Sequence, residues 1–506
     1  MLSFNQMINL LTEHQLLKEY ISNGVWHFTP TADLDDKTIK HITYDSRAVT
    51  EGSLFFCKGL AFKVDYLEQA LAQGASFYVT EKNYELETDA IGIVVTDIKK
   101  AMAVISMAFY NYPQDDLKII AYTGTKGKTT AAYFSKFILD VATQSKTALL
   151  STMETILDGK TATKSLLTTP EAVDLYRMMA EAVSNGMTHL VMEVSSQAYK
   201  TQRVYGLDFD VAIFLNISED HIGTIEHPDF DDYFYCKRQL MTHAKEVIIN
   251  RNSDFVEIIE EVSQQAGANV TTYGDDSVEA DYTFVSSAEG KGKFVVTSTQ
   301  DSLNLSGDYQ INLLGDFNQG NALSAMIATA LVGATSESMI TGLELAKVPG
   351  RMDTVTTNKG VPIYVDFAHN LLSLQTLLSF VKKEHADRRL VVVIGSTGGK
   401  GESRRKDFGN VLSELADVAI LTSDDPGTES AKDIAAEIES YLSDRVERLT
   451  ELNRAFAIKH ALETATEKDV IVLAGKGSDK YQVIGTERTP YEGDLEIATK
   501  LIEGGL

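Results

Sequence analysis

A loop rich in glycine, lysine and threonine lies between an apolar segment and a helical pattern. It consists of Thr123, Gly124, Thr125, Lys126, Gly127, Lys128, Thr129 and Thr130. Backbone N–H groups at the glycines would cradle phosphate oxygens, helped by the positive end of the following helix. Lys128 would reach the outer phosphates, and the Thr129 hydroxyl would bind Mg²⁺. The pattern predicts a phosphate-binding loop, although Tyr122 stands where the full motif has glycine; a glycine-rich turn without a ligand is the simpler alternative.

Two more side chains with metal-binding chemistry follow apolar segments of the same region. Glu193 ends the segment 189–193, so its carboxylate would lie beside the phosphate loop if both strands belong to one parallel sheet. Carboxylate oxygens are ligands that Mg²⁺ prefers. His221 follows the segment 211–215, and its spacing fits a metal ligand and a hydrogen-bonded loop residue equally well.

Four polar residues further along the chain have the chemistry to hold a nucleotide. Asn318 and Asn321 are three residues apart in a helical pattern, where their amides would contact a nucleotide or simply cap the helix. Arg351 and Asp366 stand near the start of the last region, where they would clamp a nucleotide across a domain cleft. Each of these short motifs is weak in isolation.

Alternating strands and helices must position these residues. From Leu117 onward, strands are expected at 118–122, 189–193, 211–215 and 246–250, with helices between them, which indicates an α/β fold with a mostly parallel sheet. Residues 280–312 have a polar, β-rich pattern and are expected to leave this sheet. A third alternating unit begins near Val348. We therefore expect three domains, at residues 1–114, 115–347 and 348–506, with a linker at 112–114.

The composition excludes several classes of protein. The chain of 506 residues has 72 acidic and 46 basic residues and a formal net charge of −26, which argues against a large nucleic-acid interface. Its two cysteines, Cys57 and Cys236, support neither a disulfide framework nor a cysteine-based zinc site. No basic, apolar leader begins the sequence and no apolar run is long enough to span a membrane, so a cytoplasmic location is expected.

Taken together, the motifs resemble the Mur ligase family, the ATP-dependent amino-acid ligases of bacterial peptidoglycan synthesis. The resemblance runs from Tyr44 to Tyr481 and is strongest to the branch that adds the third residue of the stem peptide. It implies a central P-loop-type domain with helices on both sheet faces, a Rossmann-like C-terminal domain and a smaller N-terminal α/β domain. The implied contacts to the UDP-muramoyl-dipeptide are Ser46, Thr168, Thr169, Ser195 and Arg203. Thr201 stands where the family often has glutamine.

The resemblance also implies a reaction and its catalytic groups. UDP-N-acetylmuramoyl-L-Ala-D-Glu would be activated by ATP to an acyl phosphate, which the amino group of the incoming amino acid would attack. Lys237 aligns with a carbamylated lysine that holds a second Mg²⁺, although an ordinary ion-paired lysine is the simpler interpretation from sequence. The implied catalytic residues are Lys128, Glu193, His221 and Lys237, and the implied metal ligands are Thr129, Glu193, His221 and Lys237. The enzyme is expected to be a monomer.

The resemblance places the choice of amino acid in the last region. Relatives that use meso-diaminopimelate have an arginine for its extra carboxylate, a charged contact worth about 1.5–3 kcal/mol. This chain has no arginine there, which favours an ammonium and points to L-lysine; a plain turn is the simpler alternative, since Asp, Pro and Gly favour turns. Lys400 and Asp479 align with an arginine and a glutamate. The expected contacts are Lys400, Asp424, Asp425, Pro426, Gly427, Gly475 and Asp479.

Four other interpretations compete with this one. Meso-diaminopimelate, ornithine or another diamino acid would keep the same reaction. A folylpolyglutamate-synthetase-like ligase shares the glycine loop but not the Tyr44-Asp-Ser-Arg and Thr168-Thr-Pro motifs. A P-loop NTPase acting as a switch or motor would have the full loop glycine, and a binding module without chemistry has no need for Glu193, His221 and Lys237 together.

Overall fold

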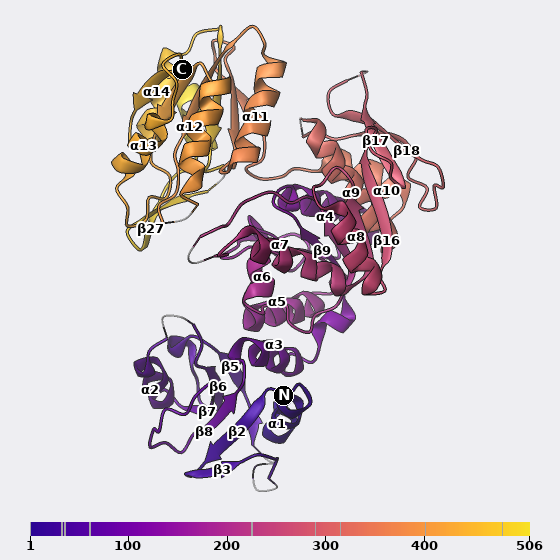
Figure 1. The fold of residues 1–506 in the computed structure, drawn as a ribbon, viewed down its shortest axis with the longest axis vertical. Coiled ribbons are helices and arrows are strands. Elements are labelled where there is room, and N and C mark those ends of the chain that lie inside the picture. The colour runs from indigo at the N-terminus through magenta and orange to yellow at the C-terminus, as the bar shows by residue number, and fades with distance from the viewer. Residues whose placement is uncertain are drawn as a thin grey trace.

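The computed structural model describes all residues except 1, 32–33, 35–36, 60–61, 224–225, 289, 314, 400 and 478, and the side chain of Asp316. Three parts follow one another along the long axis of the molecule (Figure 1). Each part is built on its own β-sheet, so the predicted α/β class with a mostly parallel central sheet is confirmed. Lys400, one of the expected substrate contacts, lies outside the described residues.

The N-terminal part contains a six-stranded sheet in the order β3-β2-β8-β7-β6-β5. Strands β5 to β8 are parallel, β2 runs antiparallel to β8, and the edge strand β3 pairs antiparallel with β2. Helix α1 begins with a capping box in which Ser3 and Gln6 satisfy each other's backbone N–H groups. The elements are β1 (Leu2–Ser3), α1 (Phe4–Glu13), β2 (Leu17–Ser22), β3 (Val25–His27), β4 (Thr38–Ile39), β5 (His41–Thr43), β6 (Ser53–Phe56), α2 (Val64–Ala72), β7 (Ala75–Thr80), β8 (Ile91–Val95) and α3 (Ile98–Phe109).

The central part contains an 11-stranded sheet in the order β12-β11-β10-β13-β9-β14-β15-β16-β17-β18-β19. Strands β10, β13, β9 and β14 to β17 are parallel, and antiparallel strands extend both edges. The strands are β9 (Lys118–Thr123), β10 (Thr147–Leu150), β11 (Glu154–Ile156), β12 (Ala162–Lys164), β13 (His189–Glu193), β14 (Phe209–Phe214), β15 (Ala244–Asn250), β16 (Asn269–Asp275), β17 (Tyr282–Ser286), β18 (Lys293–Ser298) and β19 (Gly307–Gln310). The helices are α4 (Lys128–Thr143), α5 (Ala172–Ser184), α6 (Ser196–Lys200), α7 (Phe230–Arg238), α8 (Val256–Gln265), α9 (Asp316–Leu331) and α10 (Ser336–Leu345).

The four strands expected in this part are present, and each observed bound lies within two residues of the predicted one. The expectation for residues 280–312 is wrong in one respect: β17, β18 and β19 do not leave the sheet but continue it, with β17 paired in parallel with β16. Their polar alternation arises because the sheet edge has one face in contact with the core and one in water. The expected linker begins at Tyr112, which has a positive φ of 53°, and continues as a 3₁₀ turn over Pro113–Asp116.

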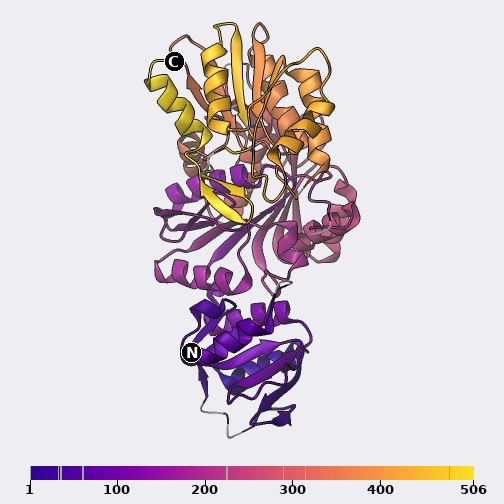
Figure 2. The same ribbon diagram turned by 90° about the vertical axis from the view of Figure 1, so that its left-hand side faces the viewer.

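The C-terminal part contains a six-stranded sheet in the order β20-β21-β25-β22-β23-β24, parallel except for β20. Helices α11 to α13 pack on one face of it and α14 and α15 on the other. A separate hairpin, β26–β27, lies beside the central part (Figure 2). The elements are β20 (Asp353–Thr356), β21 (Pro362–Asp366), α11 (Leu371–Glu384), β22 (Arg389–Ile394), α12 (Ser403–Leu415), β23 (Val418–Leu421), α13 (Ala431–Ser440), β24 (Glu447–Thr450), α14 (Arg454–Thr464), β25 (Asp469–Ala474), β26 (Tyr481–Ile484), β27 (Glu487–Pro490) and α15 (Asp494–Glu503).

Apolar side chains form separate cores on the two faces of the central sheet. One core lies under α4, α9 and α10. The core on the opposite face includes residues of α5 to α8 and is continuous with the core of the N-terminal part through α3. Among the described residues, no helix combines the length and the apolar character needed to cross a membrane.

Candidate active site

The glycine loop connects the central strand β9 to the N-terminus of α4. Gly124 and Gly127 have φ values of 151° and 81°, which residues with a side chain rarely adopt. A Cβ atom on Gly127 would lie 2.4 Å from Asn321 Oδ1, so α9 also requires glycine at this position. Lys128 Nζ folds back onto the loop and donates to the carbonyl oxygens of Gly124 (2.7 Å) and Thr125 (3.2 Å). The strand, loop and helix therefore have the geometry expected for binding phosphate.

Tyr122, which replaces the first glycine of the full motif, does not face the loop. Its side chain is fully buried beneath α4, where its hydroxyl lies 2.5 Å from Ser135 Oγ. The residue thus contributes to the core, and the loop begins at the following residue.

Glu193 and Thr129 lie together, because β13, which ends at Glu193, is parallel to β9, which leads through the glycine loop to Thr129 in α4. The Thr129 hydroxyl donates to Glu193 Oε1 at 2.8 Å. The backbone N–H of Thr152 donates to the same oxygen at 2.8 Å, and the Thr152 hydroxyl lies 3.0 Å from Glu193 Oε2. This buried carboxylate beside a hydroxyl is a set of oxygen ligands that fits Mg²⁺. Thr152 precedes β11, and no motif in the sequence marked it as a partner of Glu193.

Lys237 extends from α7 toward the same loop. Its side chain is buried, and Nζ donates to the carbonyl oxygen of Gly124 at 2.7 Å and lies 4.9 Å from the centre of the Tyr233 ring. Burial, followed by the neighbouring charge of Lys128, holds the pKa of the Lys237 amine well below its usual value. A neutral amine is the form that reacts with CO₂, so this environment fits the carbamate implied by the family resemblance.

His221 is paired with a carboxylate of its own loop. It has a positive φ of 58°, and its Nδ1 atom lies 2.9 Å from Glu226 Oε1. The neighbouring Asp220 connects the central and C-terminal parts, because it accepts hydrogen bonds from Arg404 (2.8 Å) and from Asn370 Nδ2 (3.0 Å). These contacts favour the hydrogen-bonded loop residue over the metal ligand for His221 in this conformation.

Lys126 carries a positive charge that its neighbours in the loop compensate poorly. Its Nζ atom is buried with no hydrogen-bond partner among the described residues, and burial lowers its pKa to about 7, although Asp220 and Asp366 act in the opposite direction. An unpaired buried ammonium is costly, and a bound phosphate would satisfy it. Asn216 holds the loop from β14, accepting from the Lys126 N–H at 2.9 Å. Sequence reasoning missed Asn216, since only the folded strand order brings it here.

The other expected nucleotide contacts surround this loop. Asn318 is buried and accepts from Asn321 Nδ2 at 3.3 Å, while Asn321 also touches the loop at Gly127. Asp366 ends β21, accepts from the Met352 N–H at 2.9 Å, and has its pKa raised by burial. Arg351 lies over the Phe367 ring, 5.3 Å from its centre.

Thr169, Ser195 and Arg203 form a second group that begins at the backbone of Glu193. The Thr169 hydroxyl donates to the Glu193 carbonyl (3.0 Å) and accepts from the Ser195 N–H (3.0 Å). Arg203 donates to the Thr169 carbonyl at 3.1 Å and pairs with Glu171 at 3.0 Å. Thr168 Oγ1 lies 3.1 Å from Thr152 Oγ1.

Contacts to the N-terminal part continue from Glu171. Lys58 pairs with Glu171 at 2.6 Å and lies 4.7 Å from the centre of the Tyr44 ring, whose hydroxyl donates to Asp174. Ser46, expected to contact the uridine portion, is buried and donates to Gln69 at 2.8 Å. The Ser46 side chain is thus held by α2 of the N-terminal part.

The predicted amino-acid loop, Asp424 to Gly427, is fixed by the β26–β27 hairpin. Asp425 has a positive φ of 46° and accepts from the Val483 N–H at 2.9 Å, and Gly427, with φ of 58°, pairs with Val483 and Gly485. Pro426 is buried. Gly475 has φ of 108°, and a Cβ there would lie 2.4 Å from Asp424 Oδ2.

The three aspartates of this region surround a lysine that sequence reasoning overlooked. Lys476 Nζ is 2.8 Å from Asp425, 3.7 Å from Asp479 and 3.8 Å from Asp424. Burial raises the pKa of Asp424 to about 6, against the influence of Arg454 and Lys476. Three carboxylates around one resident ammonium leave an excess of negative charge, which suits a cationic ligand.

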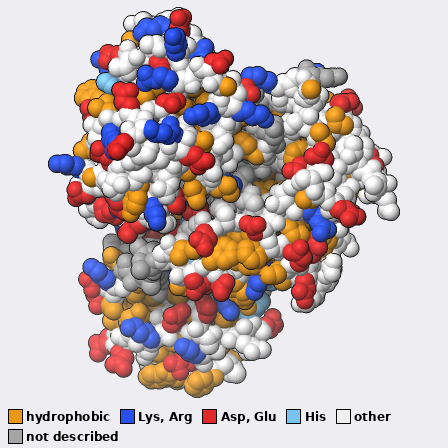
Figure 3. All heavy atoms as spheres, turned by 45° about the horizontal axis from the view of Figure 1, so that its top comes forward, with side chains coloured by type: hydrophobic (Ala, Val, Ile, Leu, Met, Phe, Trp, Pro, Cys, Tyr) orange, Lys and Arg blue, Asp and Glu red, His pale blue; other side chains and the backbone are white. Residues whose placement is uncertain are grey.

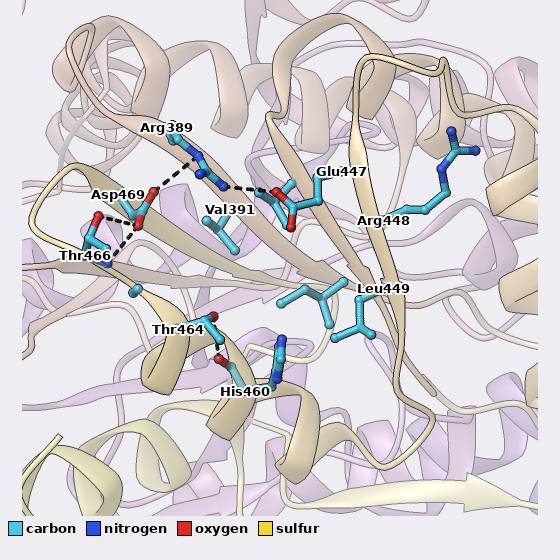
Figure 4. A pocket seen from close by; sticks show the side chains of 12 residues that line it. Arg389, Val391, Glu447, Arg448, Leu449, His460, Thr464, Thr466 and Asp469 are labelled. Atoms are coloured by element: carbon cyan, nitrogen blue, oxygen red, sulfur yellow. Dashed lines mark hydrogen bonds and ion pairs between the residues drawn. The ribbon is translucent and has the colours of Figure 1, made fainter.

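A further pocket lies at the opposite end of the C-terminal sheet (Figure 4). Arg389, Val418, Glu447 and Asp469 begin four strands and line it, whereas the candidate site follows the strand ends. Arg389 is already paired there with Asp469 (3.5 Å) and Glu447 (3.4 Å). On the face in Figure 3, acidic and basic side chains are interspersed.

Models of two protein domains match this chain. A Mur ligase middle domain matches residues 122–329, which include the glycine loop, Glu193 and Lys237. A Mur ligase, glutamate ligase domain matches residues 350–477. The chain belongs to the Mur ligase family. The family predicted from the motifs is therefore confirmed, and as a Mur ligase the protein is an ATP-dependent ligase.

Individual Mur ligases match over almost the whole chain. A UDP-N-acetylmuramoyl-L-alanyl-D-glutamate--L-lysine ligase of Enterococcus faecalis is 56% identical over 494 residues, covering 97% of each chain. A protein of the same name from Streptococcus thermophilus is 45% identical over 507 residues, covering 99% of this chain and 100% of the relative. A solved UDP-N-acetylmuramoyl-L-alanyl-D-glutamate--2,6-diaminopimelate ligase has a TM-score of 0.63 at 25% identity, covering 94% of this chain and 98% of its own.

Proposed function

We propose that this Mur ligase adds L-lysine to the D-glutamate of UDP-N-acetylmuramoyl-L-alanyl-D-glutamate, with hydrolysis of ATP to ADP and phosphate, in peptidoglycan precursor synthesis. The observation that carries the choice of amino acid is the cluster of Asp424, Asp425 and Asp479 around Lys476, without an arginine at Gly427. A distal ammonium gains from this excess of negative charge, whereas the distal carboxylate of diaminopimelate would be repelled. The relatives named as L-lysine ligases agree with this choice.

The reaction proceeds in two steps at the centre of the site. A carboxylate oxygen of D-glutamate attacks the γ-phosphorus of ATP, and ADP leaves. The α-amine nitrogen of lysine, in its neutral form, then attacks the carbonyl carbon of the acyl phosphate. The carbon–oxygen bond to the phosphate breaks, and inorganic phosphate leaves. Lys128 and Lys126 neutralise charge on the phosphates, and the backbone N–H groups of the loop hold them in place.

Side chains around the loop hold the metal and the nucleotide. Mg²⁺, when bound, neutralises the phosphate charge, and Thr129 and Glu193 are its proposed ligands. Lys237, as its carbamate, would supply a further oxygen ligand. His221 would bind the metal only if its imidazole were released from Glu226. Asn318, Asn321, Arg351 and Asp366 are proposed to contact the nucleotide, since all four lie around the phosphate loop or on the adjoining edge of the C-terminal sheet.

The two remaining substrates are assigned to opposite sides of this centre. Thr168, Thr169, Ser195 and Arg203 would hold the muramoyl-dipeptide, with Ser46 at its uridine end. Lys400, Asp424, Asp425, Pro426, Gly427, Gly475 and Asp479 would hold lysine. We propose residues 1–114, 115–347 and 348–506 as the domains that bind the UDP-substrate, ATP and the amino acid, in a cytoplasmic monomer.

Phosphate release with each amino acid tests this function. With ATP, Mg²⁺ and UDP-N-acetylmuramoyl-L-alanyl-D-glutamate, we expect turnover with L-lysine and a kcat/KM at least about 100-fold lower with meso-diaminopimelate, because the latter leaves a carboxylate facing carboxylates. L-Ornithine serves as the matched control for chain length. Preference for diaminopimelate would contradict the lysine assignment, and silence with all three amino acids, while ATP binds, would contradict the muramoyl-peptide assignment.

The affinity for L-lysine should depend on pH through Asp424. Its carboxylate is ionised above a pKa of about 6 and neutral below it, so attraction for a cation is lost as the pH falls. We expect the KM for L-lysine to rise about five- to tenfold between pH 7.5 and 5 in steady-state assays, with a much smaller change for Asp424→Asn. The KM for ATP, measured in parallel, is the control, and a KM for L-lysine that stays constant over this range would refute the assignment of Asp424.

A further inference from the structure

Lys164 of the central part reaches across to the amino-acid site of the C-terminal part. It ends β12, the edge strand of the central sheet, and its Nζ atom lies 2.9 Å from Asp479 Oδ1. The same atom lies 3.9 Å from the centre of the Tyr481 ring. Figure 2 shows the β26–β27 hairpin, which begins at Tyr481, beside the central part. A lysine ammonium is therefore held between a carboxylate and an aromatic face.

Asp479 faces two ammonium groups, and they differ in how firmly they are held. Lys476 is near its Oδ2 atom, has 1% of its side chain exposed and contacts two other aspartates, so it is a permanent part of the site. Lys164 is near Oδ1, has 45% of its side chain exposed and comes from an edge strand of another part. Lys164 can leave without breaking the core of either part.

Tyr481 adds to the attraction for cations at this position. Lys164, Lys476 and Arg488 lie 3.9, 5.0 and 4.7 Å from the centre of its ring, respectively. The negative face of an aromatic ring attracts cations electrostatically, and the effect is stronger when water is partly excluded. Carboxylate and ring together thus recognise an ammonium at the end of an aliphatic chain, which is the chemistry of a lysine side chain.

We propose that Asp479 and Tyr481 form the subsite for the side-chain ammonium of the incoming diamino acid, and that Lys164 occupies this subsite until the substrate displaces it. The proposal rests on the proposed L-lysine specificity. Asp479 was expected from the sequence, whereas Tyr481 and Lys164 are assigned here from their contacts. Lys164 acts as an intramolecular competitor, because its ammonium is chemically the same as the one it excludes.

Removing the competitor is expected to tighten the binding of L-lysine. Lys164→Met retains most of the aliphatic chain but lacks the charge, so the KM for L-lysine should fall about three- to tenfold, with kcat and the KM for ATP unchanged. Lys160→Met, at an exposed position just before the same strand, is the matched control and should leave all three constants unchanged. Titration calorimetry with L-lysine should give the same shift in Kd without turnover.

Variants of Tyr481 test the subsite itself. Tyr481→Leu should raise the KM for L-lysine about three- to tenfold, whereas Tyr481→Phe, which keeps the ring, should change it less than twofold. If the unmodified enzyme is active on L-lysine, an unchanged or higher KM for L-lysine in Lys164→Met would refute the role of Lys164 as a competitor. The proposed function would then stand. Equal effects of Leu and Phe at position 481 would overturn the role of the ring. An enzyme that is active only with another amino acid would overturn both proposals.

Discussion

Lys128→Met is expected to reduce kcat by about 10³-fold, because the substitution removes the cation that we propose to face the transferring phosphate while nearly preserving the length of the side chain. Fixed charges aimed at the transition state are worth more in a site shielded from water, where their loss costs 10²- to 10³-fold or more in rate. Lys128 begins α4, and its Nζ atom donates to the carbonyl oxygens of Gly124 and Thr125 in this structure. Phosphate release at saturating substrates measures the effect.

A matched control separates this effect from damage to the fold. Lys146→Met changes an exposed lysine just after the same helix and should leave kcat within twofold of normal. Thermal unfolding of both variants should match that of the unmodified enzyme. A kcat for Lys128→Met within about tenfold of normal would show that Lys128 does not neutralise the transferring phosphate.

Lys237→Ala is expected to lower kcat by about 10³-fold as well, and this loss should be partly reversible by chemical means. The buried amine contacts the phosphate loop, so its carbamate would supply a metal ligand there, and alanine leaves a space that a small carboxylate can fill. Adding formate or acetate should therefore raise the kcat of Lys237→Ala at least tenfold. Steady-state phosphate release over a range of carboxylate concentrations measures the rescue.

Spectroscopy distinguishes the carbamate from a merely structural lysine. After exposure to ¹³C-bicarbonate, the unmodified enzyme should show a carbamate carbon signal that is absent from Lys237→Ala. Lys245→Ala, which removes an exposed lysine of β15, should retain both the signal and the activity. Loss of activity in Lys237→Ala without rescue, together with no carbamate signal in the unmodified enzyme, would refute the modification.

The elements that carry the phosphate loop could be predicted because local patterns determine them. An apolar strand, two glycines with positive φ and a helical pattern specify β9, the loop and α4 without reference to the rest of the chain. Glu193 and Thr129 could be paired because parallel strands bring their carboxyl ends to one edge. The assignment of residues 280–312 failed because a half-exposed edge strand and a strand outside the sheet have the same polar alternation.

The contacts between distant segments could not be predicted. Asn216, Thr152 and Lys476 have no motif that marks their partners, and each reaches the site only through strand order or loop shape. Lys164 and Asp479 are 315 residues apart, and only the placement of one sheet edge against a hairpin brings them together. The orientation of His221 depends on one left-handed backbone angle, which histidine adopts without a sequence signal.

The continuous core between the N-terminal part and the central sheet determines where this molecule can open. Separating those two parts would expose the apolar faces of α3 and α5 to water, whereas the described apolar clusters of the C-terminal part begin at Met352 and include no earlier residue. Polar contacts such as Asp220–Arg404 and Lys164–Asp479 cross the second boundary. Water can replace the partly exposed Lys164–Asp479 pair at little cost, whereas the buried Asp220–Arg404 pair must be hydrated again when it separates. We therefore expect the molecule to open like a hinge between the central and C-terminal parts, while the N-terminal and central parts move as one body.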